Sequence, residues 1–292
     1  MVAETTLAPV PELPEVETVR TELEPAMTGR TFERVEILDG RLVAPDDPRG
    51  VAAELEGERV DRVGRRGKYL VISFESGRAL LCHLRMTGSF LLEPDDADPY
   101  ARAVIELDDG RTVVYRDIRR FGTWRLLEPG EIEPYLAVRL GVEPLESRFT
   151  AAWLGARMAG RRAPVKAAIL DQRTVAGLGN IYADEALWRA GIHPLRPAGN
   201  LDAAEVGRLR RTIRAALRHG IARQGATLSD YRRPNGGTGS MQNEFHVYGR
   251  LGEPCDRCGT PIAKTRAGGR GSAFCPRCQA AGVDLAYVTP RK

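Results

Sequence analysis

Four cysteines near the C-terminal end constrain the fold of this chain more than any other feature. They form two C-x2-C pairs, at Cys255, Cys258, Cys275 and Cys278. Two such pairs separated by a short stretch of chain suit tetrahedral thiolate ligation of a structural zinc ion. Because four sulfurs fill the coordination sphere, no position remains for an activated water, and we expect the metal to organise the fold rather than to catalyse.

Cysteine usage also bears on the compartment. The fifth cysteine, Cys82, lies in an apolar run and is predicted to be a buried strand residue. The clustering of the other four favours metal ligation in a reducing compartment over a secreted disulfide framework, and no thioredoxin-like context favours redox-active pairs. The chain has no apolar run of about 18 residues and no secretory signal pattern. We therefore predict a cytoplasmic bacterial protein that does not enter a membrane.

Length and charge set broader limits. The 292 residues are enough for two modest domains, and the net charge of +4 is weak evidence for a nucleic-acid partner. The distribution is more informative, because arginine is frequent over 157–233 and 250–277 while 93–109 is acidic. These basic segments indicate an anionic partner.

Two helices can be predicted from periodicity. The first follows Pro14 and places Val16, Val19 and Leu23 on one face, with Pro25 expected beyond its end. The second begins at a capping box formed by Asp202 and Glu205. Its apolar stripe is Leu209, Ile213, Leu217 and Ile221, and its basic exterior is Arg208, Arg211, Arg214 and Arg218.

Short β-type runs occupy the first half of the chain, at 31–38, 68–74, 79–84, 103–107 and 112–115. Runs of this length between Gly, Asp and Pro turns predict an antiparallel sandwich or barrel. The pattern becomes helical after about Glu128, where we place a domain boundary. The Gly-rich polar stretch between Gly225 and Gly239 predicts a mobile loop.

Several motifs together resemble one known family. They are PELPEVETVR at 11–20, GRRGKYL at 64–70, HLRMTG at 83–88, DIRRFG at 117–122, DQRTVAGLGNIYADEALW at 171–188, VYGRLGEPCDRCG at 247–259 and GRGSAFCPRCQ at 269–279. In this order they resemble the formamidopyrimidine-DNA glycosylases, over nearly all of residues 11–279. The opening PELPEVE favours the purine-lesion subgroup over relatives of endonuclease VIII.

The resemblance implies an α+β multidomain fold. We expect an N-terminal antiparallel β-sandwich with flanking helices, a helix-two-turn-helix domain and a C-terminal β-hairpin zinc finger. The expected divisions are a leader (1–10), the catalytic sandwich (11–128), a linker (129–148), the helix-two-turn-helix domain (149–241), the zinc finger (242–279) and a tail (280–292). The implied activity is excision of 8-oxoguanine and formamidopyrimidines from double-stranded DNA, followed by β,δ-elimination at the abasic site. We expect a monomer.

The resemblance also assigns catalytic roles. Pro11 corresponds to the family's N-terminal proline, whose secondary amine attacks C1′ of the damaged nucleotide, and Glu12 to the general acid that opens the sugar ring. Glu15 is a supporting active-site group. Lys68 corresponds to the lysine of the β-elimination step and Arg270 to the arginine of δ-elimination.

Further positions correspond to DNA contacts. Met86, Arg119 and Phe121 match the side chains that fill the gap left by the extruded lesion, with Arg119 facing the orphaned cytosine. Other matches to DNA-contact positions are Tyr100, Arg161, Lys166 and Asn180. Tyr100 stands where relatives often have histidine, and the sequence does not decide whether tyrosine keeps the phosphate contact that this histidine makes.

One feature departs from the family pattern. Ten residues precede Pro11, and a proline nitrogen inside a chain is a planar amide that cannot attack a sugar carbon. We hypothesise that translation starts at codon 10, since Val10 can be encoded by the initiation codon GTG, and that removal of methionine exposes Pro11.

Two alternatives remain at this point. If the leader is retained, the chain would be an inactive homologue that binds damaged DNA. A zinc-finger transcription regulator is the second, although it leaves Glu12, Lys68 and the PELPEVE string unexplained.

Overall fold

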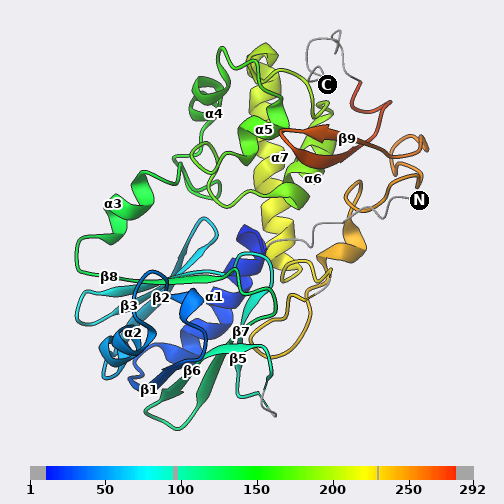
Figure 1. The fold of residues 1–292 in the computed structure, drawn as a ribbon. Helices are drawn as coiled ribbons and strands as arrows, with labels where there is room; N and C mark the ends of the chain where they lie inside the picture. Colours follow the sequence, from blue (N-terminus) through cyan, green and yellow to red (C-terminus); the bar gives the residue numbers. More distant parts are fainter. Residues whose placement is uncertain (1–10, 95–97, 229, 281–292) are drawn as a thin grey trace. The chain divides into compact units, whose positions relative to one another are not determined.

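The computed structural model describes residues 11–94, 98–228 and 230–280 (Figure 1). The predicted leader, and all of the predicted tail except residue 280, lie outside this range. The chain divides into two compact units, which are described separately. The first contains residues up to 137 together with 223–242, and the second contains 138–222 together with the residues from 243 onward.

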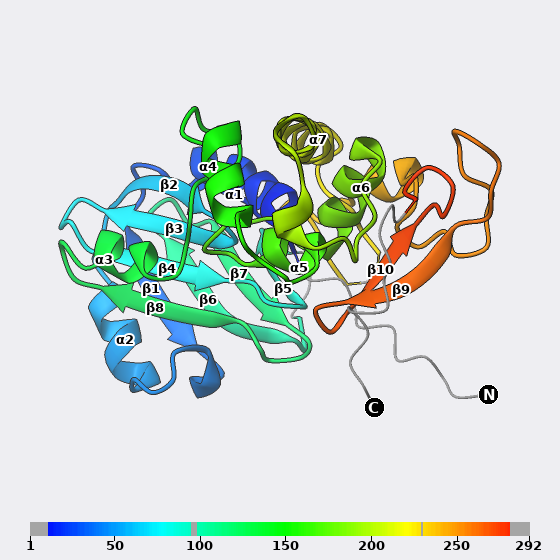
Figure 2. The same cartoon turned by 90° about the horizontal axis from the view of Figure 1, so that it is seen from above.

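Two antiparallel four-stranded sheets form the first unit (Figures 1 and 2). One sheet has the order β1 (Phe32–Ile37), β6 (Ala101–Leu107), β7 (Thr112–Asp117), β5 (Gly88–Leu92). The other has the order β2 (Val60–Arg66), β3 (Tyr69–Phe74), β4 (Ala79–His83), β8 (Thr123–Leu127). One apolar core contains side chains from both sheets, among them Phe90 and Leu80. The predicted sandwich and all five predicted strands are confirmed.

Helix α1 (Leu13–Met27) packs against β2 and lies at the N-terminal end of the described chain. Its predicted apolar face is confirmed, because Val16, Val19 and Leu23 are fully buried. The expectation that Pro25 lies beyond the helix is wrong, since Pro25 is inside its last turn. Proline removes one helical hydrogen bond, and the burial of Ala26 and Met27 in the core compensates for this loss.

The remaining helical elements of this unit are short. They are η1 (Gly40–Leu42), α2 (Pro48–Leu55) and α3 (Ile132–Ala137). Helix α2 packs on β1, and its N-cap Asp47 accepts a hydrogen bond from the Gly50 amide at 2.8 Å. This cap satisfies an amide that would otherwise lack a partner at the helix start.

The segment 223–242 returns to the first unit. Its residues up to 241 were expected to end the helix-two-turn-helix domain, with a mobile loop between Gly225 and Gly239. Contacts with α1 hold it there. The Tyr231 side chain is buried and its hydroxyl donates to the Glu15 carbonyl at 3.2 Å. Arg233 donates to Glu22 at 2.6 Å. The Leu92 amide of β5 adds a bond to the Pro234 carbonyl at 2.7 Å.

Helices dominate the second unit. They are α4 (Ala151–Met158), α5 (Val165–Leu170), α6 (Asn180–Ala190), α7 (Ala203–Ala222) and the short η2 (Ala198–Asn200), while η3 (Met241–Glu244) spans the point at which the chain passes from the first unit to the second. Helices α6 and α7 pack together. The predicted stripe of α7 is largely buried, with Leu209, Ile213 and Leu217 at 0% exposure. In the described parts of the chain, no helix is both long and apolar enough to span a bilayer.

A hairpin of β9 (Ala263–Ala267) and β10 (Arg270–Phe274) belongs to the same unit. Its turn residues Gly268 and Gly269 have φ values of +56° and +78°, a conformation that suits the twist of a two-residue hairpin and favours glycine. A side chain at Gly268 would also collide with Ala167 of α5, because an added Cβ would lie 2.7 Å from the Ala167 Cβ. The hairpin turn therefore rests on α5.

Two consecutive buried carboxylates on α6 hold this hairpin and the chain that leads into it. Glu185 is fully buried, and its Oε1 accepts the amides of His246, Val247 and Tyr248 at 3.0–3.1 Å. Asp184 accepts the Ala273 amide of β10 at 3.0 Å. Helix α6 thus anchors both the entry to the zinc-finger segment and its hairpin.

Replacing Glu185 with Ala should destabilise the protein, because it leaves three amides without their acceptor. Buried unsatisfied donors cost about 1–3 kcal/mol each, and partial solvation should bring the total loss to about 2–5 kcal/mol. Urea unfolding measures this change. The control is Glu253→Ala, which removes a carboxylate paired with Arg250 on the surface and should cost less than about 1 kcal/mol. Equal effects of the two variants would contradict the anchoring role.

Candidate functional site

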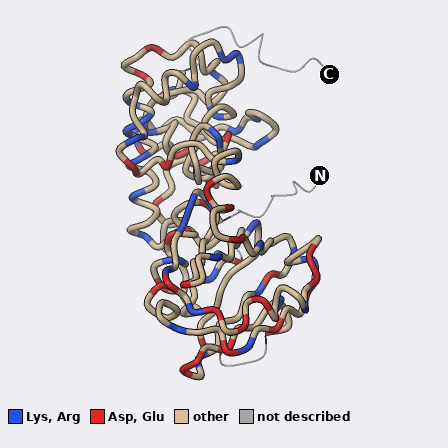
Figure 3. The backbone as a smooth tube through the Cα atoms, turned by 90° about the vertical axis from the view of Figure 1, so that its left-hand side faces the viewer, with Lys and Arg blue, Asp and Glu red and all other residues tan. Residues whose placement is uncertain are grey.

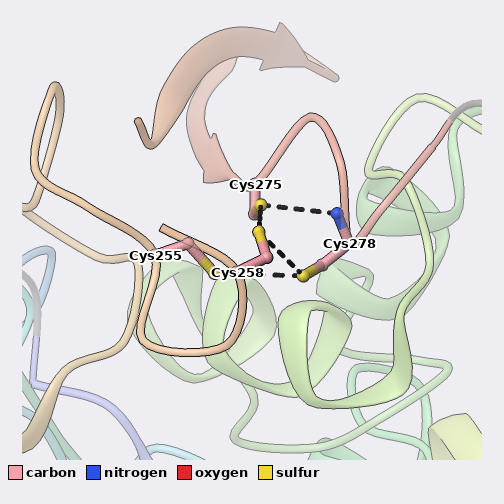
Figure 4. Close-up of side chains that lie close together, drawn as sticks. All are labelled: Cys255, Cys258, Cys275 and Cys278. Atoms are coloured by element: carbon pink, nitrogen blue, oxygen red, sulfur yellow. Dashed lines mark hydrogen bonds between the residues drawn. The ribbon is translucent and has the colours of Figure 1, made fainter. Parts of the chain in front are cut away.

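The four predicted zinc ligands lie together in the second unit (Figure 4). Their sulfur atoms are all within 4.8 Å of one another, with Cys258 at 3.5 Å from Cys275 and Cys255 at 3.9 Å from Cys278. Sulfurs at about 2.3 Å from a tetrahedral zinc ion would be about 3.8 Å apart. The four thiols therefore fit one zinc ion with a closed coordination sphere, and the predicted structural zinc site is confirmed.

Helix α6 supports this site through Trp188. The indole Nε1 donates to the Cys255 sulfur at 3.4 Å, which stabilises a metal-bound thiolate. The indole also stacks with the His246 ring, at a centroid distance of 4.2 Å, and the Arg257 guanidinium lies over it, at 3.8 Å from its centroid. His246 therefore packs beside the zinc site, where the four thiols already supply a complete set of ligands.

Cys275→Ser should lower the zinc content from one ion per chain to well below one, because a hydroxyl replaces a buried thiolate ligand. Elemental analysis after dialysis measures the content. The control is Cys82→Ser, which changes a cysteine outside the cluster and should keep one zinc per chain. Full zinc content in the Cys275 variant would contradict the four-thiolate site.

The first turn of α1 places the predicted catalytic carboxylates. Pro11, Glu12 and Glu15 are all buried. The Glu15 carboxylate accepts the Glu12 amide at 2.8 Å through Oε2 and the Ala226 amide at 2.8 Å through Oε1. Glu15 thus ties the Pro11–Glu12 segment to the returning segment 223–242. A side chain at Gly225, which has φ +79°, would contact Glu15 at 2.8 Å, so glycine is required there.

Lys68 lies in the turn between β2 and β3, directly after Gly67, whose φ is +59°. Arg65 braces this turn, because its guanidinium donates to the Gly67 carbonyl at 2.8 Å and to Glu17 of α1 at 2.9 Å. The same helix that begins at the Pro11–Glu12 segment therefore holds the Lys68 turn.

His83 lies near Lys68 at the end of β4. Its Nδ1 accepts the Arg85 amide at 3.0 Å, and its ring meets the Tyr69 ring edge to face at 4.8 Å. Burial lowers the pKa of His83 to about 3, and the positive charges of Arg85 and Lys68 add to this shift. The ring is therefore neutral at physiological pH.

The lowered pKa of His83 predicts acid sensitivity. Between pH 6.5 and about 3 the unfolded imidazole binds a proton that the folded one does not, so stability falls as pH falls through this window. His83→Asn retains an acceptor for the Arg85 amide and should flatten this dependence. Urea unfolding at several pH values from 7.5 to 4.5 measures it. An unchanged slope in the variant would show that His83 is not the responsible group.

The residues expected to fill the DNA gap lie in two connections between the sheets. Met86 is half-buried in the connection after β4, and Arg119 and Phe121 are exposed in the connection after β7. The Arg119 guanidinium lies over the Phe121 ring at 5.1 Å from its centroid. Exposure of a large aromatic side chain with an arginine stacked on it is typical of a binding surface.

Tyr100 is also exposed, just before β6. The Arg116 guanidinium lies 5.6 Å from the centroid of its ring. Arg116 is held in turn by Asp98 at 2.6 Å. The exposed Tyr100 ring, which carries the hydroxyl, is therefore packed against the Arg116 guanidinium.

Lys166 differs from expectation in the second unit. Its side chain is fully buried, 2.7 Å from Asp184 Oδ1, and its Nζ donates to the Gly271 carbonyl of β10 at 2.7 Å. The structure therefore does not present Lys166 to a phosphate, because it has no exposed surface. It instead links α5 to the residue after Arg270, whose own side chain is exposed at the start of β10.

The turn that precedes α6 is organised by Gln172, which the sequence reasoning missed. Its Nε2 donates to the carbonyls of Leu170 and Leu178 at 3.0 and 2.8 Å, and its Oε1 accepts the Gly177 amide at 2.8 Å. Asn180 follows at the first position of α6, and no described group hydrogen-bonds to its buried Oδ1. Positive partial charge at a helix start suits a phosphate. The only signal for Gln172 was its place inside the motif at 171–188.

Arg161 follows α4 and keeps about a third of its side chain exposed, with its guanidinium 3.8 Å from Asp171.

Lysine, arginine and acidic positions are interspersed along both units (Figure 3). The basic exterior of α7 is partly structural, because the guanidiniums of Arg208 and Arg214 donate to the carbonyls of Ala190 and Glu146 at 2.8 and 3.0 Å. Arg210 of the same helix donates likewise to the Phe149 carbonyl at 2.8 Å. Arginine frequency alone thus overstates the surface available to an anion.

Comparison with known proteins gives three matching family models in succession. Residues 10–124 match the formamidopyrimidine-DNA glycosylase N-terminal domain, 140–232 match the H2TH domain of the same glycosylase, and 252–281 match a zinc finger found in FPG and IleRS. These models follow the same order as the sandwich, the helices and the four-cysteine hairpin of the structure.

Individual relatives agree. A formamidopyrimidine-DNA glycosylase from Symbiobacterium thermophilum is 49% identical, and the match covers 97% of this chain and 93% of the relative. One from Roseiflexus is 45% identical, and the match covers 92% of this chain and 100% of the relative. The crystal structure of the FPG protein from Thermus thermophilus superposes with a TM-score of 0.84. Its sequence is 43% identical, and the match covers 94% of this chain and 100% of that chain. A variant of the Lactococcus lactis FPG protein, crystallised with DNA that contains Fapy-dG, is 37% identical and has a TM-score of 0.87. This match covers 92% of this chain and 100% of that chain.

The sandwich, the H2TH helices and the four-thiolate hairpin define a zinc-bearing DNA-repair glycosylase. More specifically, the chain belongs to the formamidopyrimidine-DNA glycosylase family.

Proposed function

We propose that this protein excises oxidised purines such as 8-oxoguanine and formamidopyrimidines from double-stranded DNA, and that it cleaves the resulting abasic site by β,δ-elimination. The observation that carries this proposal is the arrangement at the start of α1. Pro11 and Glu12 are adjacent and buried, and Glu15 fixes their backbone by accepting the Glu12 amide at 2.8 Å. Related proteins of Lactococcus lactis bind DNA that contains Fapy-dG or an abasic site.

The first chemical step needs the Pro11 nitrogen as a secondary amine. Its lone pair forms a bond to C1′ of the damaged nucleotide while the bond from C1′ to the base breaks. The nitrogen then gives up its proton, and the base, which leaves with the electron pair, takes up a proton. Glu12 protonates the sugar ring oxygen, and the lone pair that the nitrogen has regained breaks the bond from C1′ to this oxygen, so that the ring opens and C1′ becomes an iminium carbon. Because a secondary amine cannot lose this charge as a neutral imine, the adduct draws electrons towards itself.

Elimination follows from this electron demand. Removal of a proton from C2′ sends its electron pair towards the iminium and expels the 3′ phosphate, which is the β-elimination step that we assign to Lys68. A second removal of a proton expels the 5′ phosphate, and we assign support of this δ-elimination to Arg270. Lys68 is a half-buried cation in a turn that Arg65 braces, and Arg270 is an exposed cation at the start of β10, next to Gly271, whose carbonyl accepts from Lys166. Cations held in this way suit a role beside phosphates.

The remaining groups are proposed to bind DNA. Arg161, Asn180 and Tyr100 would contact the backbone, while Met86, Arg119 and Phe121 would fill the gap left by the lesion. Lys166 is assigned a supporting role, because it is buried against β10. A monomer in the bacterial cytoplasm stays a prediction.

Borohydride trapping on a duplex containing 8-oxoguanine tests the proposal, because reduction fixes a Schiff base as a stable covalent adduct. Two versions of the chain are compared, one beginning at Met1 and one beginning at Pro11. We expect the adduct with the second version only, since Pro11 is an amide in the first. Glu12→Gln in the second version should slow formation of the trapped adduct by about 100-fold or more, because Glu12 protonates the ring oxygen in the step that forms the iminium.

Other results of this comparison would contradict the proposal. Absence of an adduct with the version that exposes Pro11, in protein that binds damaged duplex, would favour an inactive homologue that only recognises lesions. Trapping of both versions with equal yield would show that Pro11 is not the nucleophile. Glu253→Gln, a surface change in the zinc-finger segment, is the matched control and should trap like the parent chain.

A further inference from the structure

Two connections in the first unit cross between the sheets at neighbouring strand ends. The connection 84–87 leads from β4 to β5, and 118–122 leads from β7 to β8. Strands β4 and β8 pair in one sheet with His83 opposite Thr123. Strands β5 and β7 pair in the other with Gly88 opposite Asp117. Each connection therefore starts and ends beside the other.

A buried polar pair joins these connections. Thr87 and Asp117 are each 1% exposed, and the Thr87 hydroxyl donates to Asp117 Oδ1. The same hydroxyl oxygen accepts the Arg119 amide at 2.9 Å. Asp117 Oδ2 accepts the Gly122 amide at 2.7 Å. One carboxylate thus closes 118–122 on itself and ties it to the residue after Met86.

Close packing around Tyr115 leaves this arrangement little freedom. A Cβ added at Gly122 would lie 1.8 Å from the Tyr115 hydroxyl oxygen, and one added at Gly88 would lie 2.3 Å from it. The backbone at the end of each connection therefore packs directly against the buried Tyr115 side chain. Interiors packed this closely move between discrete arrangements rather than deform gradually.

The backbone of each connection is also held in an unusual conformation. Arg85 and Arg120 have φ values of +55° and +59°, which residues other than glycine rarely adopt. Asp39, which is buried, holds Arg120 through a hydrogen bond from Nη2 at 2.8 Å and a second bond from Nε. Such conformations persist where the surroundings enforce them and are common in binding loops.

The side chains that these connections present are Met86, Arg119 and Phe121, the residues that the proposed function assigns to the gap in the DNA. Two of these three residues adjoin the polar pair: Met86 directly precedes Thr87, and the Arg119 amide donates to both members. Groups held in their bound geometry before binding avoid the entropy cost of ordering on the DNA. A mobile arginine would also discriminate less well between opposing bases.

We propose that Thr87 and Asp117 are positioning residues that hold Met86, Arg119 and Phe121 as one rigid wedge, and that this wedge sets the preference for the base opposite the lesion. This inference rests on the proposed function, in which these three side chains enter the gap. Thr87 and Asp117 are buried, and their effect on DNA is exerted through the backbone of the two connections.

Binding to duplexes that contain tetrahydrofuran, an uncleavable abasic analogue, tests the proposal without requiring chemistry. The affinity ratio for duplexes with cytosine or adenine opposite the analogue is measured for the parent chain beginning at Pro11 and for its variants. Thr87→Val keeps the side-chain shape but removes the hydroxyl, and Asp117→Asn replaces one acceptor oxygen with a donor. Both variants should lose about 10-fold of the preference for cytosine, since a misplacement of about 1 Å at a contact is enough for such a loss.

Two control variants separate positioning from stability. Thr87→Ser keeps the hydroxyl and should retain the parent's ratio. Ser89→Ala removes another fully buried hydroxyl of β5, for which no described group serves as a hydrogen-bond partner, and should also retain it. Urea unfolding of all variants shows which of them lose stability, and a purely structural role would lower stability or overall affinity without changing the ratio.

The outcomes separate this inference from the proposed function. A ratio within twofold of the parent in both Thr87→Val and Asp117→Asn would overturn the positioning role, as would a parent chain that prefers neither base. Failure of the parent to form a borohydride adduct would contradict the catalytic proposal alone. In that case the affinity ratio for cytosine against adenine would still test whether Thr87 and Asp117 position the wedge.

Discussion

Two adjacent buried carboxylates on α6 are the constraint on which the second unit depends. Asp184 and Glu185 are fully or nearly fully buried, and they bond to opposite ends of the zinc-finger segment, at Ala273 and at His246–Tyr248. Burying charge is costly unless each oxygen is satisfied. Backbone amides, and Lys166 beside Asp184, offset part of this cost, and these bonds fix the hairpin that carries Arg270.

The same principle operates in the first unit, where Glu15 and Asp117 play comparable parts. Glu15 ties the Pro11–Glu12 segment to the returning chain at Ala226, and Asp117 ties together two connections between the sheets. In each case a buried carboxylate accepts bonds from backbone far away or across a turn. The exposed residues that are proposed to meet DNA therefore stand on backbone that is already fixed.

Sequence reasoning predicted the features that leave a local pattern. The zinc ligands followed from cysteine spacing, and α1 and five strands followed from periodicity. Strands β2, β5 and β8 were missed, because VDRVGRR is largely charged and GSFLL and TWRLL are short and without alternation. Pro25 was placed outside α1 because its propensity is local, whereas the burial of Met27 that holds the last turn is tertiary.

The site was only partly accessible from sequence for the same reason. Family motifs named Pro11, Glu12, Lys68 and Arg270, and whether they act as assigned is a proposal. Motifs could not show that Lys166 is buried against Asp184, that segment 223–242 returns to α1, or that Gln172 orders the turn before α6. Each of these depends on residues that are distant in the sequence or on side-chain direction, which no spacing rule specifies.

The central claim is that the Pro11 nitrogen becomes covalently bonded to the sugar of a damaged nucleotide. Mass spectrometry of peptides from the borohydride-reduced adduct locates that bond directly. We expect the nucleotide mass on the peptide that begins at Pro11, and fragmentation should place it on Pro11 itself. A nucleotide attached to Lys68, or to any other lysine, would contradict it.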